Sequence, residues 1–338
     1  MIAAFFLNVP TFKMLSFEQI LRVVDREIGQ FHFNKAPRSL FEPIEYTLLL
    51  GGKRIRPCLT LMACNLYGED IRRSLKPALG MEFFHNFTLL HDDLMDAADK
   101  RRNQATVHKK WSVNTAILSG DAMLIAAYRL IGETPEPYLK TVMDLFSETA
   151  LEICCGQQYD MEFEKREDVS EEEYLEMIRL KTAVLIACCL KTGAIIGGAS
   201  DADAEHLSRF GHYIGLAFQL QDDLLDVYGD PEIFGKNIGG DILCNKKTFL
   251  RIQALLLANE QQKAQMDYYS NPSNTFSPNE KIRVFTDVYN RLHVKEITQQ
   301  KMNDLFALAI RELTCLRVPP DSLSELYETA NMLIQREF

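Results

Sequence analysis

Two nearly identical acidic motifs, each within a run of apolar and aromatic residues, constrain the fold of this chain more than any other feature. They read Asp92-Asp93-Leu94-Met95-Asp96 and Asp222-Asp223-Leu224-Leu225-Asp226. On a helix, residues three and four positions apart share a face, so the three carboxylates of each motif would gather on one side. Like charges at that spacing repel each other, and burying them is costly unless a cation lies between them. Ligation by oxygen alone favours Mg²⁺ over zinc.

An apolar stripe with the period of a helix leads into each motif. Phe83, Phe87 and Leu90 precede the first motif at that spacing, and Leu216 and Leu220 precede the second. A single motif of this kind is most often a solvated acidic face, whereas two of them inside apolar runs favour a bound cation. A cavity that is acidic at its mouth and apolar beneath suits an amphiphilic ligand.

The composition fits a large helical protein. The chain has 338 residues, of which 47% are hydrophobic, so it can bury a sizeable core. Helical spacing dominates, with helix starts predicted just after Ser16 and at Ser170, and convincing strands are absent. We therefore predict an all-α fold. Residues 1–14 are expected to be a peripheral tail before one domain over 15–338, and Met14 is a candidate start residue.

Charge, cysteine content and the first residues bear on partners and location. The formal net charge of −10 at pH 7 argues against a general nucleic-acid binder, which needs a basic surface. Eight cysteines without Cys-x-x-Cys spacing indicate reduced thiols, and we expect a cytoplasmic protein. The first ten residues are apolar but lack a basic start, and Pro10 interrupts them. We therefore expect neither a signal peptide nor membrane insertion.

Basic residues form two clusters that could bind an anionic substrate. Lys53 and Arg56 lie one helical turn apart after the turn at Gly51-Gly52, and Arg101-Arg102 follow the first acidic motif closely. Each cluster alone is most often a surface patch. Beside a metal-binding motif, however, arginine side chains could hold the phosphate oxygens that the metal also contacts.

Taken in order, these motifs make the chain resemble the trans-type isoprenyl diphosphate synthases of the polyprenyl synthetase family. The resemblance covers roughly residues 41–248, and the joint order and spacing of many short motifs make it specific. The matching motifs are Gly51 to Pro57, His85, Asp92 to Asp96 with Arg101-Arg102, Gly120-Asp121, Lys181-Thr182, Phe218 to Asp226, Gly235-Lys236 and Lys246-Lys247-Thr248.

The resemblance implies a role for each matching residue. Lys53, Arg56, His85 and Arg102 match the site for isopentenyl diphosphate, and Arg101 matches a contact to the allylic diphosphate. The residues that match the lining of the allylic diphosphate and the reacting carbons are Lys181, Thr182, Gln219, Lys236 and Lys246. The predicted Mg²⁺-binding carboxylates are Asp92, Asp93, Asp96, Asp222, Asp223 and Asp226, with Asp92, Asp96 and Asp222 as the positions that match known metal ligands. The family fold is a single large helical bundle around a deep central cavity, usually a homodimer.

The activity implied is a head-to-tail condensation of an allylic diphosphate with isopentenyl diphosphate, assisted by Mg²⁺. Loss of diphosphate leaves an allylic cation, so stabilising the leaving group is the main task. Product length would depend on residues one and two turns before the first motif, namely Phe84, Phe87 and Thr88. An aromatic residue at the fifth position before the motif alone resembles geranylgeranyl-type enzymes, so we expect a C15 to C20 product and lean towards C20.

Two other functions remain open from the sequence. A class I terpene cyclase shares the first motif, but its second motif mixes other residues, and it needs no Lys53 and Arg56 site. A non-catalytic helical partner subunit or a carboxylate-bridged metal bundle is the other alternative, although its di-iron form needs two Glu-x-x-His pairs and only Glu82 to His85 is present. The chain departs from the family at Asn103 and Ala105, where glycine and proline are common, so a looser loop is expected there. It also lacks a basic C-terminal tail, and no residue beyond Gln253 is expected to take part in the chemistry.

Overall fold

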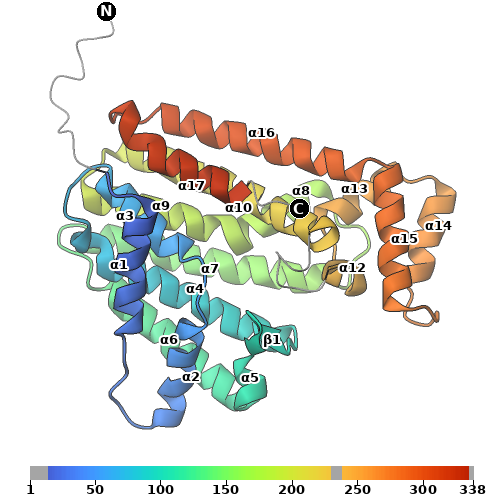
Figure 1. Cartoon of the computed structure of the whole chain (residues 1–338), viewed down its shortest axis with the longest axis horizontal. Helices are drawn as coiled ribbons and strands as arrows, with labels where there is room; N and C mark the ends of the chain where they lie inside the picture. The colour runs from blue at the N-terminus through green and yellow to red at the C-terminus, as the bar shows by residue number, and fades with distance from the viewer. Residues whose placement is uncertain (1–13, 230–237, 335–338) are drawn as a thin grey trace, which may run out of the picture. The chain divides into compact units, whose positions relative to one another are not determined.

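The structure is a computed structural model that describes residues 14–229 and 238–334. Helices make up most of this part of the chain, which confirms the predicted all-α fold (Figure 1). The one sheet in the described residues is a hairpin of β1 (Lys100–Arg101) and β2 (Gln104–Ala105). Arg102 and Asn103 at its tip both have left-handed backbone, as a two-residue type I′ turn requires. The position where we expected a looser loop is therefore a regular hairpin turn.

The chain divides into two compact units. Unit 1 comprises Met1–Glu148, Leu185–Ser208 and Leu313–Thr329, and unit 2 comprises Thr149–Val184, Arg209–Glu312 and Ala330–Phe338. Five helices contain the points where the chain passes from one unit to the other: α7 (Leu139–Phe163), α9 (Val184–Gly197), α10 (Asp201–Tyr228), α16 (Val294–Thr314) and α17 (Ser324–Ile334). A single domain with a central cavity stays a prediction.

Unit 1 is built around a buried helix, α4 (Leu75–Met95). This helix is apolar on nearly all sides, which is typical of a helix in the middle of a core. It packs most extensively on α6 (Val113–Ile131), and two glycines make the approach close. A Cβ at Gly80 of α4 would lie 2.9 Å from the Ile131 side chain, and one at Gly120 of α6 would overlap the His91 ring. The remaining helices that lie wholly in unit 1 are α1 (Phe17–Gly29), α2 (Arg38–Leu49), α3 (Ile55–Asn65), η1 (Ile71–Ser74), α5 (Val107–Lys110) and η3 (Pro320–Leu323).

Unit 2 contains a second apolar core around the C-terminal end of α10. Leu224 and Val227 pack there with Leu250, Phe285 and Val288. These last three residues belong to α13 (Phe249–Leu257) and α15 (Pro278–Arg291), and α14 (Glu260–Ser270) lies beside α15 (Figure 1). The other short helices of this unit are α8 (Glu171–Ile178), the π-helical turn η2 (Arg179–Ala183) and α12 (Gly240–Leu243).

Helix ends follow the sequence signals closely. Ser16 and Ser170 each accept a hydrogen bond from the backbone N–H three residues on, and Gln19 and Glu173 complete both capping boxes. Both predicted helix starts are confirmed. One stretch of the described residues, Glu171–Gly197, is long and apolar enough to span a membrane, but 83% of its most apolar window is buried. Such burial is typical of a core helix in a globular protein.

Candidate active site

The first acidic motif lies at the C-terminal end of α4, where helix geometry makes negative charge costly. The helix dipole is negative at that end, and no basic residue occupies the last turn. Asp93 is buried, Asp92 is half-buried, and Asp96 is the exposed C-cap residue. Three carboxylates at a helix C-terminus repel one another and the dipole, so the motif favours a bound cation.

Arg101, on the β1 strand, forms an ion pair with Asp93, the middle carboxylate of this motif. Its Nε donates to both oxygens of Asp93 at 2.8 and 2.9 Å, and one terminal nitrogen lies 3.8 Å from Asp92. Burial raises the pKa of Asp93, although Arg101 opposes that rise. Both Asp93 oxygens thus accept hydrogen bonds from Arg101.

Unit 1 also brings together the residues predicted to bind isopentenyl diphosphate. The Arg56 guanidinium donates to His85 Nε2 at 3.2 Å, so the ring proton is assigned to Nδ1. Burial and the neighbouring Arg56 hold the pKa of His85 well below its usual value, which leaves the ring neutral. Arg102 donates to the carbonyl of Gly51 and covers the glycine turn, while Lys53 is exposed.

A buried ion pair fixes the start of α3 beneath these residues. Arg54 has left-handed backbone, and its side chain donates to Glu82 Oε1 at 2.7 Å. Both side chains are only 3% exposed, and Asn86 also donates to Glu82. The Glu82 carboxylate therefore pairs with Arg54, so the single Glu-x-x-His sequence, Glu82 to His85, is unsuited to bind iron.

The residues predicted to set product length lie within an aromatic cluster on α4. Phe84 is buried against Phe146, with ring centroids 5.2 Å apart. Phe87 is half-buried and packs on Phe84 at 5.6 Å and on His91 at 4.8 Å. Thr88 Oγ1 donates to the backbone carbonyl of His85. Phe84 thus contacts both Phe87 and Phe146.

In unit 2, the second acidic motif repeats the pattern of the first. Asp223 is buried, whereas Asp222 and Asp226 are half-buried. Tyr174 donates its hydroxyl proton to Asp223 Oδ2, and Gln219 Nε2 donates to Oδ1 at 3.3 Å. Burial, together with the charge of Asp241, raises the pKa of Asp223 to about 7. As in the first motif, both oxygens of the middle carboxylate accept hydrogen bonds within the protein.

The predicted allylic-site residues of unit 2 belong to two polar groups. Thr182 Oγ1, on η2, donates to Gln219 Oε1 at 3.1 Å. Because Gln219 also donates to Asp223, it links Thr182 to the second acidic motif. Lys181 Nζ, from the same π-helical turn, donates to Asp160 at 2.6 Å. Burial would raise the pKa of Asp160, but Lys246 and Lys181 outweigh burial and lower it. Both lysines therefore lie near one carboxylate. A π-helical turn often marks a functional position.

Sequence reasoning missed three residues that hold the predicted ones in place. Asp160 and Tyr174 carry no local signal, because their partners are distant in sequence. Asp241 follows Gly239-Gly240 and precedes Lys246 closely, which could have drawn attention to it. Its backbone N–H donates to Asp226 Oδ2 at 3.0 Å. Lys236, also predicted to bind diphosphate, lies outside the described residues.

The donor set fits a hard divalent cation that is shared with a substrate. In residues 14–229 and 238–334, no three acidic, histidine or cysteine side chains already converge into a complete metal site. Mg²⁺ is usually held by one or two carboxylates together with waters and substrate phosphates, so an incomplete set of oxygen ligands suits it. Arginine and histidine side chains in the same unit offer the complementary donors for phosphate.

Comparison with known proteins gives a consistent result. The chain is 36% identical over 318 residues to geranylgeranyl diphosphate synthase of Methanosarcina mazei, covering 93% of this chain and 95% of that protein. A crystal structure of a geranylgeranyl pyrophosphate synthase shares 41% identity with a TM-score of 0.91, covering 96% of this chain and all of that one. The Corynebacterium glutamicum geranylgeranyl pyrophosphate synthase, solved with isoprenyl diphosphate and magnesium, shares 28% identity with a TM-score of 0.86 over 96% of this chain and 100% of that chain. The sequence model of the polyprenyl synthetase family matches residues 37–292. The chain therefore belongs to the polyprenyl synthetase family.

Proposed function

We propose that this protein is a Mg²⁺-dependent prenyltransferase that joins an allylic diphosphate to isopentenyl diphosphate, head to tail, and releases diphosphate. The observation that carries the proposal is the arrangement in unit 1, where a carboxylate cluster at the end of α4 lies beside Arg101, and Arg56, His85 and Arg102 form a second group of donors. Two diphosphates per cycle need two groups of this kind.

The proposed metal ligands are the outer carboxylates of each motif, namely Asp92, Asp96, Asp222 and Asp226. Bound Mg²⁺ would supply charge neutralisation for the diphosphate leaving group. Asp93 and Asp223 instead act as positioning residues, because both oxygens of each accept hydrogen bonds within the protein. Arg101 in unit 1, and Lys181 and Lys246 in unit 2, would each add positive charge that helps to stabilise the leaving group.

The reaction balances without a protein base. The carbon–oxygen bond of the allylic substrate breaks, and its electron pair leaves with the diphosphate. The terminal carbon of the double bond of isopentenyl diphosphate then forms the new carbon–carbon bond, which leaves a cation on its neighbour. The next carbon along loses a proton to the departing diphosphate, and the electrons of that C–H bond form the new double bond. His85 is unsuited to accept that proton, because its Nε2 already accepts a hydrogen bond from Arg56 and its pKa is depressed. Its role is to bind isopentenyl diphosphate together with Arg56, Arg102 and Lys53.

The proposed main product is C20, with C15 as the nearest alternative. Relatives named geranylgeranyl diphosphate synthase occur in Methanosarcina mazei and Sulfolobus acidocaldarius, and the comparisons do not favour a terpene cyclase or a non-catalytic subunit. Incubation with Mg²⁺, isopentenyl diphosphate and each allylic primer tests the proposal directly. Longer prenyl diphosphates support it. Hydrocarbons formed without isopentenyl uptake would instead identify a cyclase, and no turnover would leave the partner subunit as the explanation.

We further propose a cytoplasmic homodimer that associates through an apolar face of α6. Leu118 and Ile125 on this helix are 59% and 62% exposed, and they lie two turns apart on one side. All eight cysteines are free thiols, which fits a reducing compartment. Sedimentation of the Leu118→Glu variant tests the interface: the variant should sediment as a monomer, and an unchanged mass would place the contact elsewhere.

A further inference from the structure

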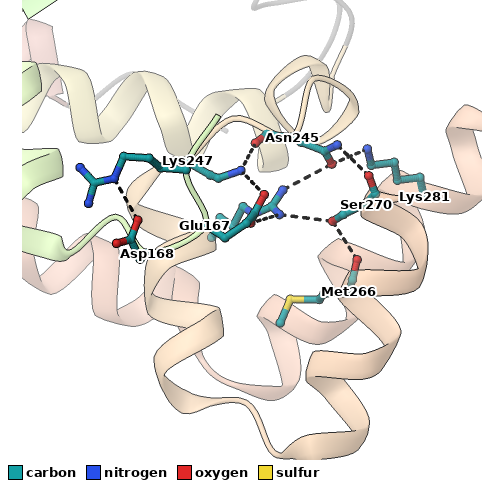
Figure 2. Close-up of polar contacts among 9 residues, drawn as sticks. Glu167, Asp168, Asn245, Lys247, Met266, Ser270 and Lys281 are labelled. Atoms are coloured by element: carbon teal, nitrogen blue, oxygen red, sulfur yellow. Dashed lines mark hydrogen bonds and ion pairs between the residues drawn. The ribbon is translucent and has the colours of Figure 1, made fainter. Parts of the chain in front are cut away.

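The turn that carries Lys246 is held by a lysine from a part of the chain without an assigned role. Lys281, on α15, is buried, and its Nζ donates to Asn245 Oδ1 at 2.7 Å (Figure 2). The same Nζ donates to the carbonyl of Leu243 at 3.1 Å. Leu243 is the last residue of α12, and Asn245 directly precedes Lys246. A single ammonium group thus joins two points of the turn over residues 239–246.

Asn245 is the residue on which three helices converge. Besides Lys281 from α15, Arg251 from α13 donates to its Oδ1 at 3.4 Å, and its own Nδ2 donates to the carbonyl of Ser270 at the end of α14 at 3.0 Å (Figure 2). Its backbone is left-handed, with φ of 56°. Asparagine is among the few residues besides glycine that adopt this conformation readily. The side chain therefore anchors the turn, and the backbone directs the chain into Lys246.

The other side of the same turn is bonded to the second acidic motif. Asp226 accepts hydrogen bonds from the backbone N–H groups of Gly239 and Asp241, at 2.6 Å to its carbonyl and 3.0 Å to its carboxylate. Lys246 N–H donates to the carbonyl of Asp241 at 2.9 Å. The position of Lys246 thus depends on Asp226 at one end of the turn and on Asn245 at the other.

Burying the charged ammonium group of Lys281 costs desolvation free energy, so a lysine at this position is not explained by stability alone. Among the described residues, no carboxylate lies within ion-pair distance of its ammonium group, which bonds only to neutral oxygens. The nearby Arg251 is also buried, and its ion pair is with Glu167, whose side chain is 74% exposed. Replacing buried charges by apolar residues is often neutral or stabilising. What the charge provides here is directed hydrogen bonding to the turn.

We propose that Lys281 and Asn245 are positioning residues that hold Lys246 in place for the allylic diphosphate. The helices α13, α14 and α15 then act as a support for the reaction, although none of their residues needs to contact substrate. This inference rests on the proposed function, because the role of Lys246 is itself part of that proposal.

The test compares steady-state kinetics of the full-length variants Lys281→Met and Asn245→Gly. Glycine keeps the left-handed backbone and removes only the side-chain hydrogen bonds. Each variant should lower kcat/KM for the allylic diphosphate about tenfold while the KM for isopentenyl diphosphate stays within about twofold, because a small displacement of a charged group costs rate. The double variant should lose less than the product of the two single effects, since both changes remove the Lys281–Asn245 hydrogen bond.

Two controls separate this inference from general destabilisation and from the proposed function. Lys301→Met removes another lysine of unit 2, which donates to Glu171 at 2.8 Å but does not contact the turn, and it should leave both KM values unchanged. Hydrogen exchange should rise in the peptide over residues 239–248 in Lys281→Met and Asn245→Gly only. If Lys246→Ala lowers activity but both test variants match the wild type, the positioning role is wrong. If Lys246→Ala retains normal activity, the proposed role of Lys246 fails instead.

Discussion

Replacing Phe87 by alanine should lengthen the product by one five-carbon unit. The growing chain, if it extends from the first acidic motif along α4, meets the half-buried Phe87 ring before it meets Phe84. The substitution removes about six ring carbons, slightly more than the roughly five carbons of an isoprenyl unit, so the space fits one further addition. Phe84 would then form the next wall, because Phe146 packs against it.

The size of the effect follows from apolar burial. An added isoprenyl unit in the vacated space would bury about five carbons at roughly 0.8 kcal/mol each, or about 4 kcal/mol. In the wild type, the same unit would have to displace the ring, and overpacking of that kind costs about 1–3 kcal/mol. Since about 1.4 kcal/mol corresponds to a tenfold change, the longer diphosphate should become the main product.

Radiolabelled isopentenyl diphosphate and chromatography of the dephosphorylated products measure the chain length. The matched control is Phe83→Ala on the same helix, because Phe83 is fully buried and packs on Phe31 with ring centroids 4.7 Å apart. This variant should lose stability but keep its product length. An unchanged product profile in Phe87→Ala, or an equal lengthening in Phe83→Ala, would refute the reasoning.

Three other predictions concern the metal, the pH dependence and stability. Asp92→Ala should abolish turnover with unchanged circular dichroism, and near-normal activity would contradict the metal-binding role. In EDTA, the free energy of unfolding should fall as pH rises from about 4 to 7, since Asp223 has a pKa of about 7 when folded and about 3.9 when unfolded, so the folded state binds its proton more tightly. In urea titrations, the Asp223→Asn variant should lack this part of the fall in unfolding free energy. If its pH curve runs parallel to that of the wild type, Asp223 is not the group responsible. Glu82→Ala should lower the free energy of unfolding by about 3–5 kcal/mol in the same assay, because it leaves buried Arg54 without its ion pair. The control Asp144→Asn, which breaks the exposed ion pair with Lys140, should have no measurable effect.

Much of the fold was predictable because its signals are local. Helical periodicity and the capping boxes at Ser16 and Ser170 depend on residues a few positions apart, so the all-α fold and both helix starts could be predicted. Partners that lie far apart in sequence could not. Lys181 and Asp160 are 21 residues apart, Asn245 and Lys281 are 36 apart, and Tyr174 and Asp223 are 49 apart.

The two middle aspartates show the same division between local and distant information. Residue type alone makes the three carboxylates of each motif equivalent candidate ligands, and the family resemblance singles out Asp92, Asp96 and Asp222. Tertiary contacts show that Arg101 donates to Asp93 and that Tyr174 donates to Asp223, whereas Gln219 reaches Asp223 from one turn earlier on the same helix. The same contacts could not be inferred from residue type, because arginine, tyrosine and glutamine are common throughout the chain.

The close packing of α4 on α6 has a consequence for how such an enzyme can be altered. Gly80 and Gly120 leave no room for a side chain between these helices, so α4 cannot shift or rotate without a clash at Ile131 or His91. Its backbone is therefore a fixed scaffold, with the acidic motif at one end and exchangeable side chains at Phe87 and Thr88 one turn away. On the proposed roles of Phe87 and of the acidic motif, single substitutions on this helix would change product size and leave the metal-binding end undisturbed.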